Sequence, residues 1–138
     1  MNKPNTYQTE RNFAYKPFEI FKAFSDPNRL AKWWGPNGFT NIFEIFEFKV
    51  NGDWKFLMRS PDGSSFPNQC VFLEIQVNKK LVIQHTNSPN FTLTIHLISK
   101  GNTTRVLWVQ EFDDPVIAKA MEQIVTKANE ENLDRLLL

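Results

Sequence analysis

Two histidines and one cysteine are the residues of this chain best suited to catalysis or metal binding. Neither His85 nor His96 has a cysteine, a carboxylate or a second histidine at the spacing of metal ligands. His85 shares its expected strand face with Leu81 and Ile83, which is more typical of a hydrogen-bonded core histidine than of a catalyst. His96 alternates with threonines and is expected at the surface. The sequence therefore predicts no metal site and no cofactor, and it identifies no catalytic residues.

Cys70 is the only cysteine, so no internal disulfide can form. It begins the apolar run Cys70–Leu73, which favours a small buried side chain over a redox role. The first residues, Met1–Arg11, are polar and lack the apolar segment of a signal peptide. Together these features predict a reducing, cytoplasmic setting.

Two polar residues stand on strand faces that are otherwise apolar. Glu44 alternates with isoleucine and phenylalanine, and Gln110 alternates with Val106 and Trp108. A carboxylate that is buried without a partner is costly and shifts its pKa, so an inward-facing Glu44 would orient a ligand or act as a base. The alternative places Glu44 at a solvated strand end. The direction in which Glu74 faces is left open in the same way.

The composition limits the classes of function. The chain has 138 residues and a formal net charge of +1, and no basic run is longer than Lys79-Lys80, which argues against nucleic-acid binding. No apolar run approaches the ~18 residues that cross a bilayer. The 13 phenylalanines and four tryptophans are many for one small domain, and bulky rings that pack imperfectly leave pockets. We therefore expect one domain, residues 1–138, that binds neither nucleic acid nor membranes, with its oligomeric state open.

The elements expected from the sequence are one strand, two short helices, six strands and one long helix. Alternation predicts the first strand over residues 5–14, and Pro17 and Asp26-Pro27 are typical helix starts. Later alternating segments predict an antiparallel meander, in which Asn51-Gly52 would form a two-residue hairpin turn. Its strands are expected at residues 42–50, 53–60, 68–77, 81–86, 91–98 and 103–112.

The last segment, residues 114–137, is predicted to be one continuous helix with an N-cap at Asp114. A helix with one apolar stripe must pack on the sheet. The fold class is therefore α+β, a curved seven-stranded antiparallel sheet around a long C-terminal helix, which leaves part of the concave face unfilled. The stripe is formed by Ile117, Met121, Ile124, Val125, Ala128, Asn132 and Leu136.

The unfilled part of the concave face is the expected binding cavity. Trp33 and Trp34 project about 100° apart on a helix, so we expect Trp33 to hold the second helix on the sheet and Trp34 to line the cavity mouth. Glu44 and Gln110 are the expected polar anchors. The expected wall residues are Trp34, Phe46, Trp54, Phe56, Phe72, Trp108, Met121 and Val125.

Several motifs occur in an order that resembles a known family. They are Pro17–Pro27 (PFEIFKAFSDP), Leu30–Pro36 (LAKWWGP), Glu47–Gly52, Pro61-Asp62-Gly63, Phe72–Ile75 and Leu133–Leu136 (LDRL). Over nearly its whole length the chain resembles the START-like, or helix-grip, superfamily, in the branch named after the activator of the Hsp90 ATPase. The resemblance implies the helix-grip fold. It also implies a role like those found in the branch, which contains chaperone regulators and ligand carriers.

The chain departs from the family pattern at two positions. Asn51-Gly52 replaces a pair of glycines, and Ala128-Asn129 stands where the family commonly has Gly-Trp. Loss of that tryptophan ring is expected to enlarge the cavity or to make it more polar.

Three functions remain open from the sequence. The leading hypothesis is binding of a small apolar molecule, of unknown identity, in the cavity. The second is a protein-interaction role, including contact with a chaperone as for the family's namesake. The third is a cyclase- or lyase-type enzyme, which would need a titratable residue with a shifted pKa deep in the cavity.

Overall fold

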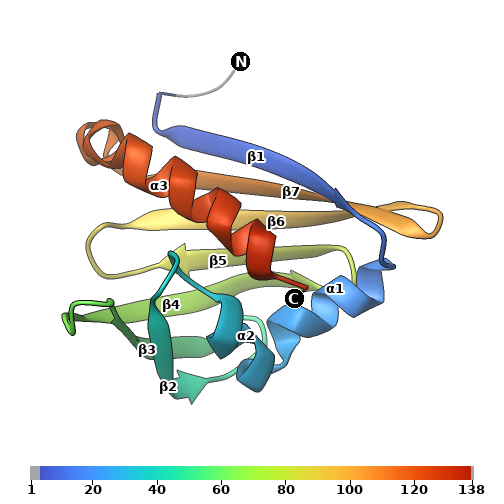
Figure 1. Ribbon diagram of the computed structural model, residues 1–138, viewed down its shortest axis with the longest axis horizontal. Helices are drawn as coiled ribbons and strands as arrows, with labels where there is room; N and C mark the ends of the chain where they lie inside the picture. The colour runs from blue at the N-terminus through green and yellow to red at the C-terminus, as the bar shows by residue number, and fades with distance from the viewer. Residues whose placement is uncertain (1–3, 138) are drawn as a thin grey trace.

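The computed structural model describes residues 4–137 and contains the elements in the predicted order. Figure 1 shows that the three helices lie on the same side of one curved sheet. The α+β helix-grip fold class is therefore confirmed. The elements are β1 (Thr6–Phe13), α1 (Pro17–Ser25), α2 (Pro27–Trp33), β2 (Thr40–Phe46), β3 (Asp53–Arg59), β4 (Ser65–Gln76), β5 (Lys80–His85), β6 (Phe91–Lys100), β7 (Thr103–Phe112) and α3 (Pro115–Arg135).

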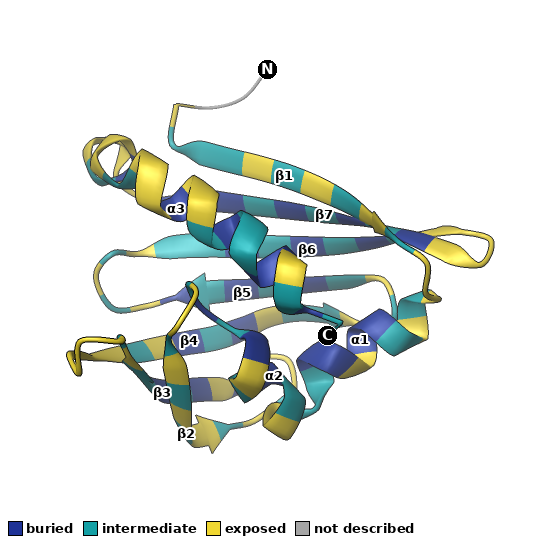
Figure 2. Cartoon of the chain, viewed as in Figure 1, coloured by how far each residue is buried: buried dark blue, intermediate teal, exposed yellow. Residues whose placement is uncertain are grey.

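The sheet has seven antiparallel strands in the order β1-β7-β6-β5-β4-β3-β2. Strands β2 to β7 follow one another as a meander, and β1 pairs with β7, so β1 and β2 are the two edges. On β6 and β7, buried residues alternate with less buried ones, as the bands in Figure 2 show. The inward set includes Leu93, Ile95, Val106 and Trp108, because successive side chains of a strand point to opposite faces of the sheet.

Two bulges interrupt this alternation. The register shifts between Phe43 and Ile45 in β2 and between Phe72 and Glu74 in β4. A bulge adds one residue to one strand, so that residues on either side of it no longer share a face by simple alternation. Glu44 is the additional residue in β2, and Phe43 on one side of it packs against the core.

The predicted two-residue turn at Asn51-Gly52 is wrong, because residues 47–52 all lie between β2 and β3. A type I′ turn needs positive φ at both central residues; Asn51 has a φ of +66°, but Gly52 is outside the left-handed region. A Cβ on Gly52 would lie 2.0 Å from Glu47 O, so the close approach of the backbone requires glycine there. The longer connection carries Phe48, whose ring packs against the core.

Helix α3 is one continuous helix, as predicted, and Asp114 caps it by accepting a hydrogen bond from Val116 N at 2.8 Å. Its buried residues are centred on Val125 and Asn129, and the surface turned away from the sheet is exposed (Figure 2). The predicted stripe is wrong at Ile124, which is 65% exposed, because it projects about 100° from Val125 around the helix axis. No helix within residues 4–137 has the length and hydrophobicity needed to cross a bilayer.

Polar contacts fix both ends of α3. Near its start, Tyr7 Oη donates to Ala118 O at 2.7 Å. Further along, Arg11 on β1 forms ion pairs with Glu130 at 2.8 Å and Asp134 at 2.5 Å. The helix is thereby held over the β1 edge of the sheet, which decides how far it reaches across the concave face.

Candidate functional site

A cavity of about 230 Å³ lies between the concave face of the sheet, α3 and the turn that follows α2. Strands β3 to β7 form its floor, Gly35 and Pro36 contribute to its rim, and residues of α3 between Met121 and Asn132 cover it. Ile124 contributes to the lining and is also highly exposed. The cavity therefore opens to solvent beside α3.

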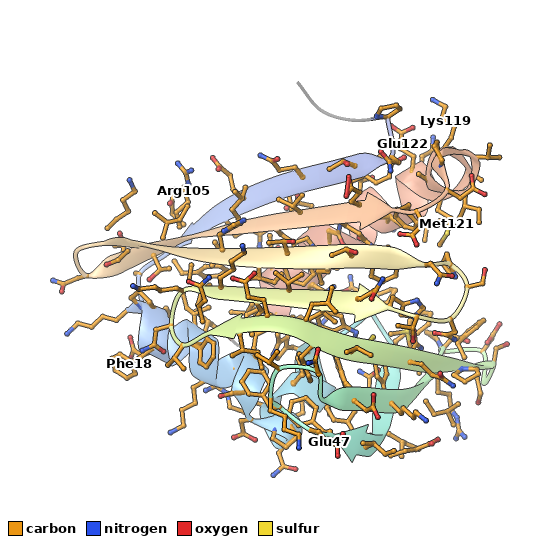
Figure 3. The ribbon with its side chains drawn as sticks, turned by 180° about the vertical axis from the view of Figure 1, so that it is seen from behind. Phe18, Glu47, Arg105, Lys119, Met121 and Glu122 are labelled. Atoms are coloured by element: carbon orange, nitrogen blue, oxygen red, sulfur yellow. The ribbon has the colours of Figure 1, made fainter. Side chains whose placement is uncertain are left out.

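A larger hollow of about 750 Å³ lies at the outside of the molecule, beside α1 and the β4–β5 and β6–β7 turns. Its lining includes Phe18 and Val77, which are 55% and 67% exposed. Figure 3 shows Phe18 projecting from α1 away from the sheet. Walls as exposed as these cannot remove a small molecule from water, so the smaller cavity is the candidate site.

The structure brings together six of the residues predicted for the site. Phe56 comes from β3, Trp108 and Gln110 come from β7, and all three point to the concave face. Met121 and Val125 face them from α3, and Figure 3 shows Met121 on the same part of that helix as Lys119 and Glu122. The sixth residue is Trp34.

Phe46, Trp54 and Phe72 face inward as predicted, but they do not line the cavity. They belong to an aromatic cluster that we define as Phe43, Phe46, Phe48, Trp54 and Phe72. The rings of Trp54 and Phe72 are stacked with centroids 5.9 Å apart, and Phe46 meets each of them edge-on at 5.9 and 5.7 Å. These rings fill their part of the concave face by packing on one another.

The prediction that Glu44 is a polar anchor of the cavity is wrong. Glu44 is exposed and is absent from the lining. The β2 bulge is the reason, because it breaks the alternation that appeared to place Glu44 on the same face as Phe46. The solvated strand position, the other reading of the sequence, is the one observed.

The two adjacent tryptophans have different environments. Trp33 is 4% exposed and its Nε1 donates to Ala23 O at 3.0 Å, which ties α2 to α1. Trp34 is partly buried and lines the cavity, with its ring centroid 5.8 Å from that of Trp108. The two rings touch edge-on with centroids 5.6 Å apart, but α2 ends at Trp33 and Trp34 has an extended backbone, so Trp34 lines the cavity.

Gln110 and Asn129 form a polar pair in the cavity wall. Asn129 Nδ2 donates to Gln110 Oε1 at 3.1 Å, and both residues are 7% exposed. Sequence reasoning identified Gln110 from its strand face. It identified Asn129 only as a departure from the family pattern, which the structure places in the lining.

His85 also lines the cavity, and it is a hydrogen-bonded core histidine, as its strand position predicted. Nδ1 lies 2.8 Å from Pro89 O, Nε2 lies 2.7 Å from Asn68 Oδ1, and the ring stacks on Phe91 with centroids 4.6 Å apart. Burial lowers the pKa of His85, although its hydrogen bonds to backbone groups act in the opposite direction. We expect a neutral ring at pH 7, which donates a hydrogen bond from one nitrogen and is held in place by stacking on Phe91.

Cys70 is the other titratable residue among the described residues of the lining. It is 4% exposed, and burial raises the pKa of its thiol to about 12. A thiol that stays protonated is a poor nucleophile. Cys70 therefore acts as a small apolar part of the floor, in agreement with the first interpretation of its sequence context.

The turn after α2 is joined to the end of α3 by buried polar contacts. Gly35 N donates to Asn132 Oδ1 at 2.8 Å, and Arg135 Nη2 donates to Trp33 O at 3.0 Å and to Gly35 O. Gly35 has a φ of +104°, a conformation that favours glycine. These contacts hold one side of the cavity rim, and the sequence offered no signal for them beyond the LDRL motif.

Comparison with known proteins agrees with this architecture. Residues 14–137 match the family model described as Activator of Hsp90 ATPase homolog 1-like protein. The chain belongs to this family. No curated protein matches the chain. As a member of the Hsp90-activator-like family, the chain carries the family's pattern over all the elements from α1 to α3.

Solved structures show the same fold. A crystal structure of a protein from Nitrosomonas europaea has a TM-score of 0.89 at 21% identity, covering 99% of this chain and 94% of that chain. A crystal structure of a protein from Chromobacterium violaceum has a TM-score of 0.87 at 23% identity, covering 96% and 95%. At these identities the likeness shows the fold alone. What this member of the Hsp90-activator-like family binds must be argued from its own cavity.

Proposed function

We propose that the protein binds a small, uncharged and largely apolar molecule in the cavity between the sheet and α3. The observation that carries this proposal is the composition of the wall, in which aromatic and aliphatic side chains predominate. No described residue of the lining is Asp, Glu, Lys or Arg, so a charged ligand would lose its hydration without gaining an opposite charge.

The cavity volume indicates the size of the ligand. About 230 Å³ exceeds the roughly 150 Å³ of an engineered apolar cavity that admits benzene. It lies just below the range of about 300–1,000 Å³ that is typical of sites for drug-sized molecules. A compound with one or two fused rings, or a short branched chain, is the best fit.

Apolar burial would supply most of the binding free energy, at about 25 cal/mol per Å² of apolar surface removed from water. Trp34, Phe56 and Trp108 offer ring faces, and Met121 at the rim is flexible enough to adapt to different shapes. Because few wall groups are directional, we expect the protein to accept a range of apolar bodies of similar size.

A fluorescent hydrophobic dye tests this proposal. The dye should bind the folded wild-type protein at micromolar concentration, and Val125→Trp should block it by filling the space under α3, where Val125 is 6% exposed. Lys127→Trp is the matched control, because it places the same ring on the exposed side of the helix. Absence of dye binding to wild type, or equal binding by both variants, would contradict the proposal.

An enzymatic role is less well supported by the cavity. Its described titratable groups are Cys70 and His85. The thiol has a raised pKa, and both nitrogens of His85 contact protein oxygens. A general base needs a free lone pair within reach of the substrate, and neither group offers one in this arrangement.

A protein-interaction role is the second candidate, and one observation favours it. Strand β2 is an edge of the sheet, and it exposes Ile42 by 56% and Ile45 by 38%. An exposed edge with apolar side chains can pair with another chain. We infer that a protein partner, a chaperone among the candidates, would bind here, in the cytoplasmic setting that the lone buried Cys70 supports.

Calorimetric titration with purified Hsp90 tests this second role. The Ile42→Lys, Ile45→Lys double variant should lose any binding seen with wild type, while keeping its affinity for the hydrophobic dye. Phe18→Lys, a change to an exposed apolar residue on α1, is the matched control. Binding that survives the double variant, or no binding to wild type, would remove Hsp90 as the partner of β2.

A further inference from the structure

The Gln110–Asn129 pair leaves hydrogen-bonding capacity unused inside the cavity. The bond between them uses Asn129 Nδ2 and Gln110 Oε1. Within residues 4–137, Gln110 Nε2 and Asn129 Oδ1 have no protein partner. Fully enclosed side-chain atoms without a partner occur elsewhere, for example at Trp108 Nε1, but not in this pair. The free amide atoms therefore still reach open space, and the cavity is the space that both residues line.

The pair offers one donor group and one acceptor whichever way its two amides are oriented. In the arrangement described, the free donor is Gln110 Nε2 and the free acceptor is Asn129 Oδ1. If both amides were turned over, Gln110 Nε2 would donate to Asn129 Oδ1, and the roles of the free atoms would be exchanged between the residues. The chemistry presented to a ligand is the same in both cases.

We propose that the cavity selects a neutral ligand whose polar group both accepts and donates a hydrogen bond, as a lactam, a secondary amide or a similar group does, and that Gln110 and Asn129 recognise this group. The inference rests on the proposed binding function. It adds the chemical class of the ligand and the two residues that distinguish it.

Three physical arguments support this choice of class. A purely apolar ligand would cover both amide groups and leave their free atoms without water or a partner, which is costly in a buried site. An ion would find no opposite charge among the described wall residues. A ligand with an acceptor alone would satisfy Gln110 and leave Asn129 unpaired. A group with both functions satisfies the pair.

The apolar surroundings favour a flat body attached to that group. The Trp34 and Trp108 rings are tilted by 34° with centroids 5.8 Å apart, and both line the cavity together with Phe56. Stacking on such rings suits an aromatic or conjugated ligand. A bicyclic lactam combines a flat body with the required donor and acceptor at a size that matches the cavity.

A series of similar bicyclic compounds tests the inference. Carbostyril has an adjacent N–H and C=O, N-methylcarbostyril has the acceptor only, and naphthalene has neither. Affinity is measured by quenching of tryptophan fluorescence and by calorimetry. Wild type should bind carbostyril at least about tenfold more tightly than either other compound, because a site built to pair with a polar group discriminates against analogues that lack it. In the Gln110→Leu, Asn129→Leu double variant the preference should disappear while naphthalene still binds.

The outcomes separate this inference from the proposed function. If wild type binds naphthalene as tightly as carbostyril, and Val125→Trp blocks both, the binding function stands and the inference is wrong. If no compound binds wild type, both are wrong. Circular dichroism monitors the fold of the double variant. Should it fail to fold, the wild-type preference for carbostyril over both N-methylcarbostyril and naphthalene decides alone, because methylation removes the N–H donor and keeps the carbonyl acceptor.

Discussion

The two halves of the concave face both contain large aromatic residues, but the space in them is filled differently. At the β2–β4 end, the aromatic cluster packs ring on ring, and Phe21 of α1 closes it with a centroid distance of 5.7 Å to Phe48. At the β5–β7 end, α3 covers the sheet with Ala128, Asn129 and Asn132. Asn129 reaches Gln110 of β7, but these small or polar side chains leave space beside them. The cavity lies in that second half and extends to inward-facing residues of β3 and β4.

The comparison shows that a side chain can point into the concave face without the space around it being filled. Both halves bury large aromatic residues, for example Trp54 and Trp108, which are 0% and 1% exposed. What differs is the opposing surface. Where rings oppose rings, they pack on one another and bury each other, and the residues Phe46, Trp54 and Phe72 do not line the cavity. Where a helix presents amides and alanine, a void remains whose mainly apolar wall carries a few polar side chains, and such a void is suited to binding.

The largest expected effect is in the aromatic cluster. Trp54→Ala should lower the free energy of unfolding by about 3–5 kcal/mol, because it removes a fully buried ring from a densely packed site. Trp34→Ala should cost clearly less, because that ring borders space that is already empty, and it should weaken dye binding. Urea denaturation measures both. If both substitutions lowered the free energy of unfolding equally, the two halves of the concave face would not differ in how tightly they are packed.

The same comparison can be made between the adjacent residues Trp33 and Trp34. Trp33→Ala should cost about 3–5 kcal/mol, since it removes a buried ring together with the hydrogen bond to Ala23 O. The variant should still bind the dye if the rim keeps its shape. A small loss of stability combined with a large loss of dye binding would reverse the roles assigned to Trp33 and Trp34.

An intermediate effect is expected where the rim is tied to α3. Asn132→Ala should cost about 1–3 kcal/mol, because it leaves the buried Gly35 N–H without its acceptor. Asn37→Ala, which removes the exposed side-chain contacts of Asn37 with Glu131 and Arg135, is the control and should change stability by less than about 0.5 kcal/mol. Thermal unfolding of the three proteins measures the difference. Equal effects would mean that the buried bond does not hold the rim.

Because of His85, the free energy of unfolding should depend on pH. Burial lowers its pKa in the folded state below the ordinary value of 6.5, so the unfolded state binds the proton more readily. Stability contributed by the neutral ring is therefore complete above about pH 6.5 and is lost as the pH falls through the lower folded pKa. Unfolding free energies measured from pH 7.5 to 5 should fall less steeply for His85→Gln than for wild type. If the unfolding free energies of wild type and His85→Gln changed in parallel with pH, His85 would not have a lowered pKa in the folded state.

The smallest effect is expected at Glu44. Because the side chain is exposed in the β2 bulge, Glu44→Gln should change stability by less than about 0.5 kcal/mol and leave dye affinity unaltered. Equilibrium titration with the dye measures this. A change in dye affinity would mean that Glu44 contacts the cavity, and it would favour the enzymatic hypothesis.

Local signals in the sequence were sufficient for most of the fold. Alternation located all seven strands, Asp26 and Asp114 were correctly identified as helix N-caps, and the long final helix was predicted to within two residues at each end. These features depend on neighbours along the chain, such as the side-chain oxygen that meets an amide two residues later. These features can therefore be predicted from a single sequence.

Besides the turn at Asn51-Gly52, the errors occur where the face of a strand residue or the direction of a helix residue depends on distant partners. The β2 bulge arises from pairing with β3 and turned Glu44 outward. The rotation of α3, which left Ile124 exposed, depends on contacts with β1 such as those of Arg11. One added residue reverses a strand face, and about 100° of helical rotation separates a buried position from an exposed one.

By itself, the sequence determined the fold class, the order of the elements and a supply of inward-facing rings, because these follow from periodicity and local capping. Only the tertiary structure decided which rings fill the interior and which border a void. It alone brought Gln110 of β7 and Asn129 of α3 within hydrogen-bonding distance. A cavity is the space that remains after distant elements have packed, so its shape and the polar groups in its wall depend on contacts that no local pattern encodes.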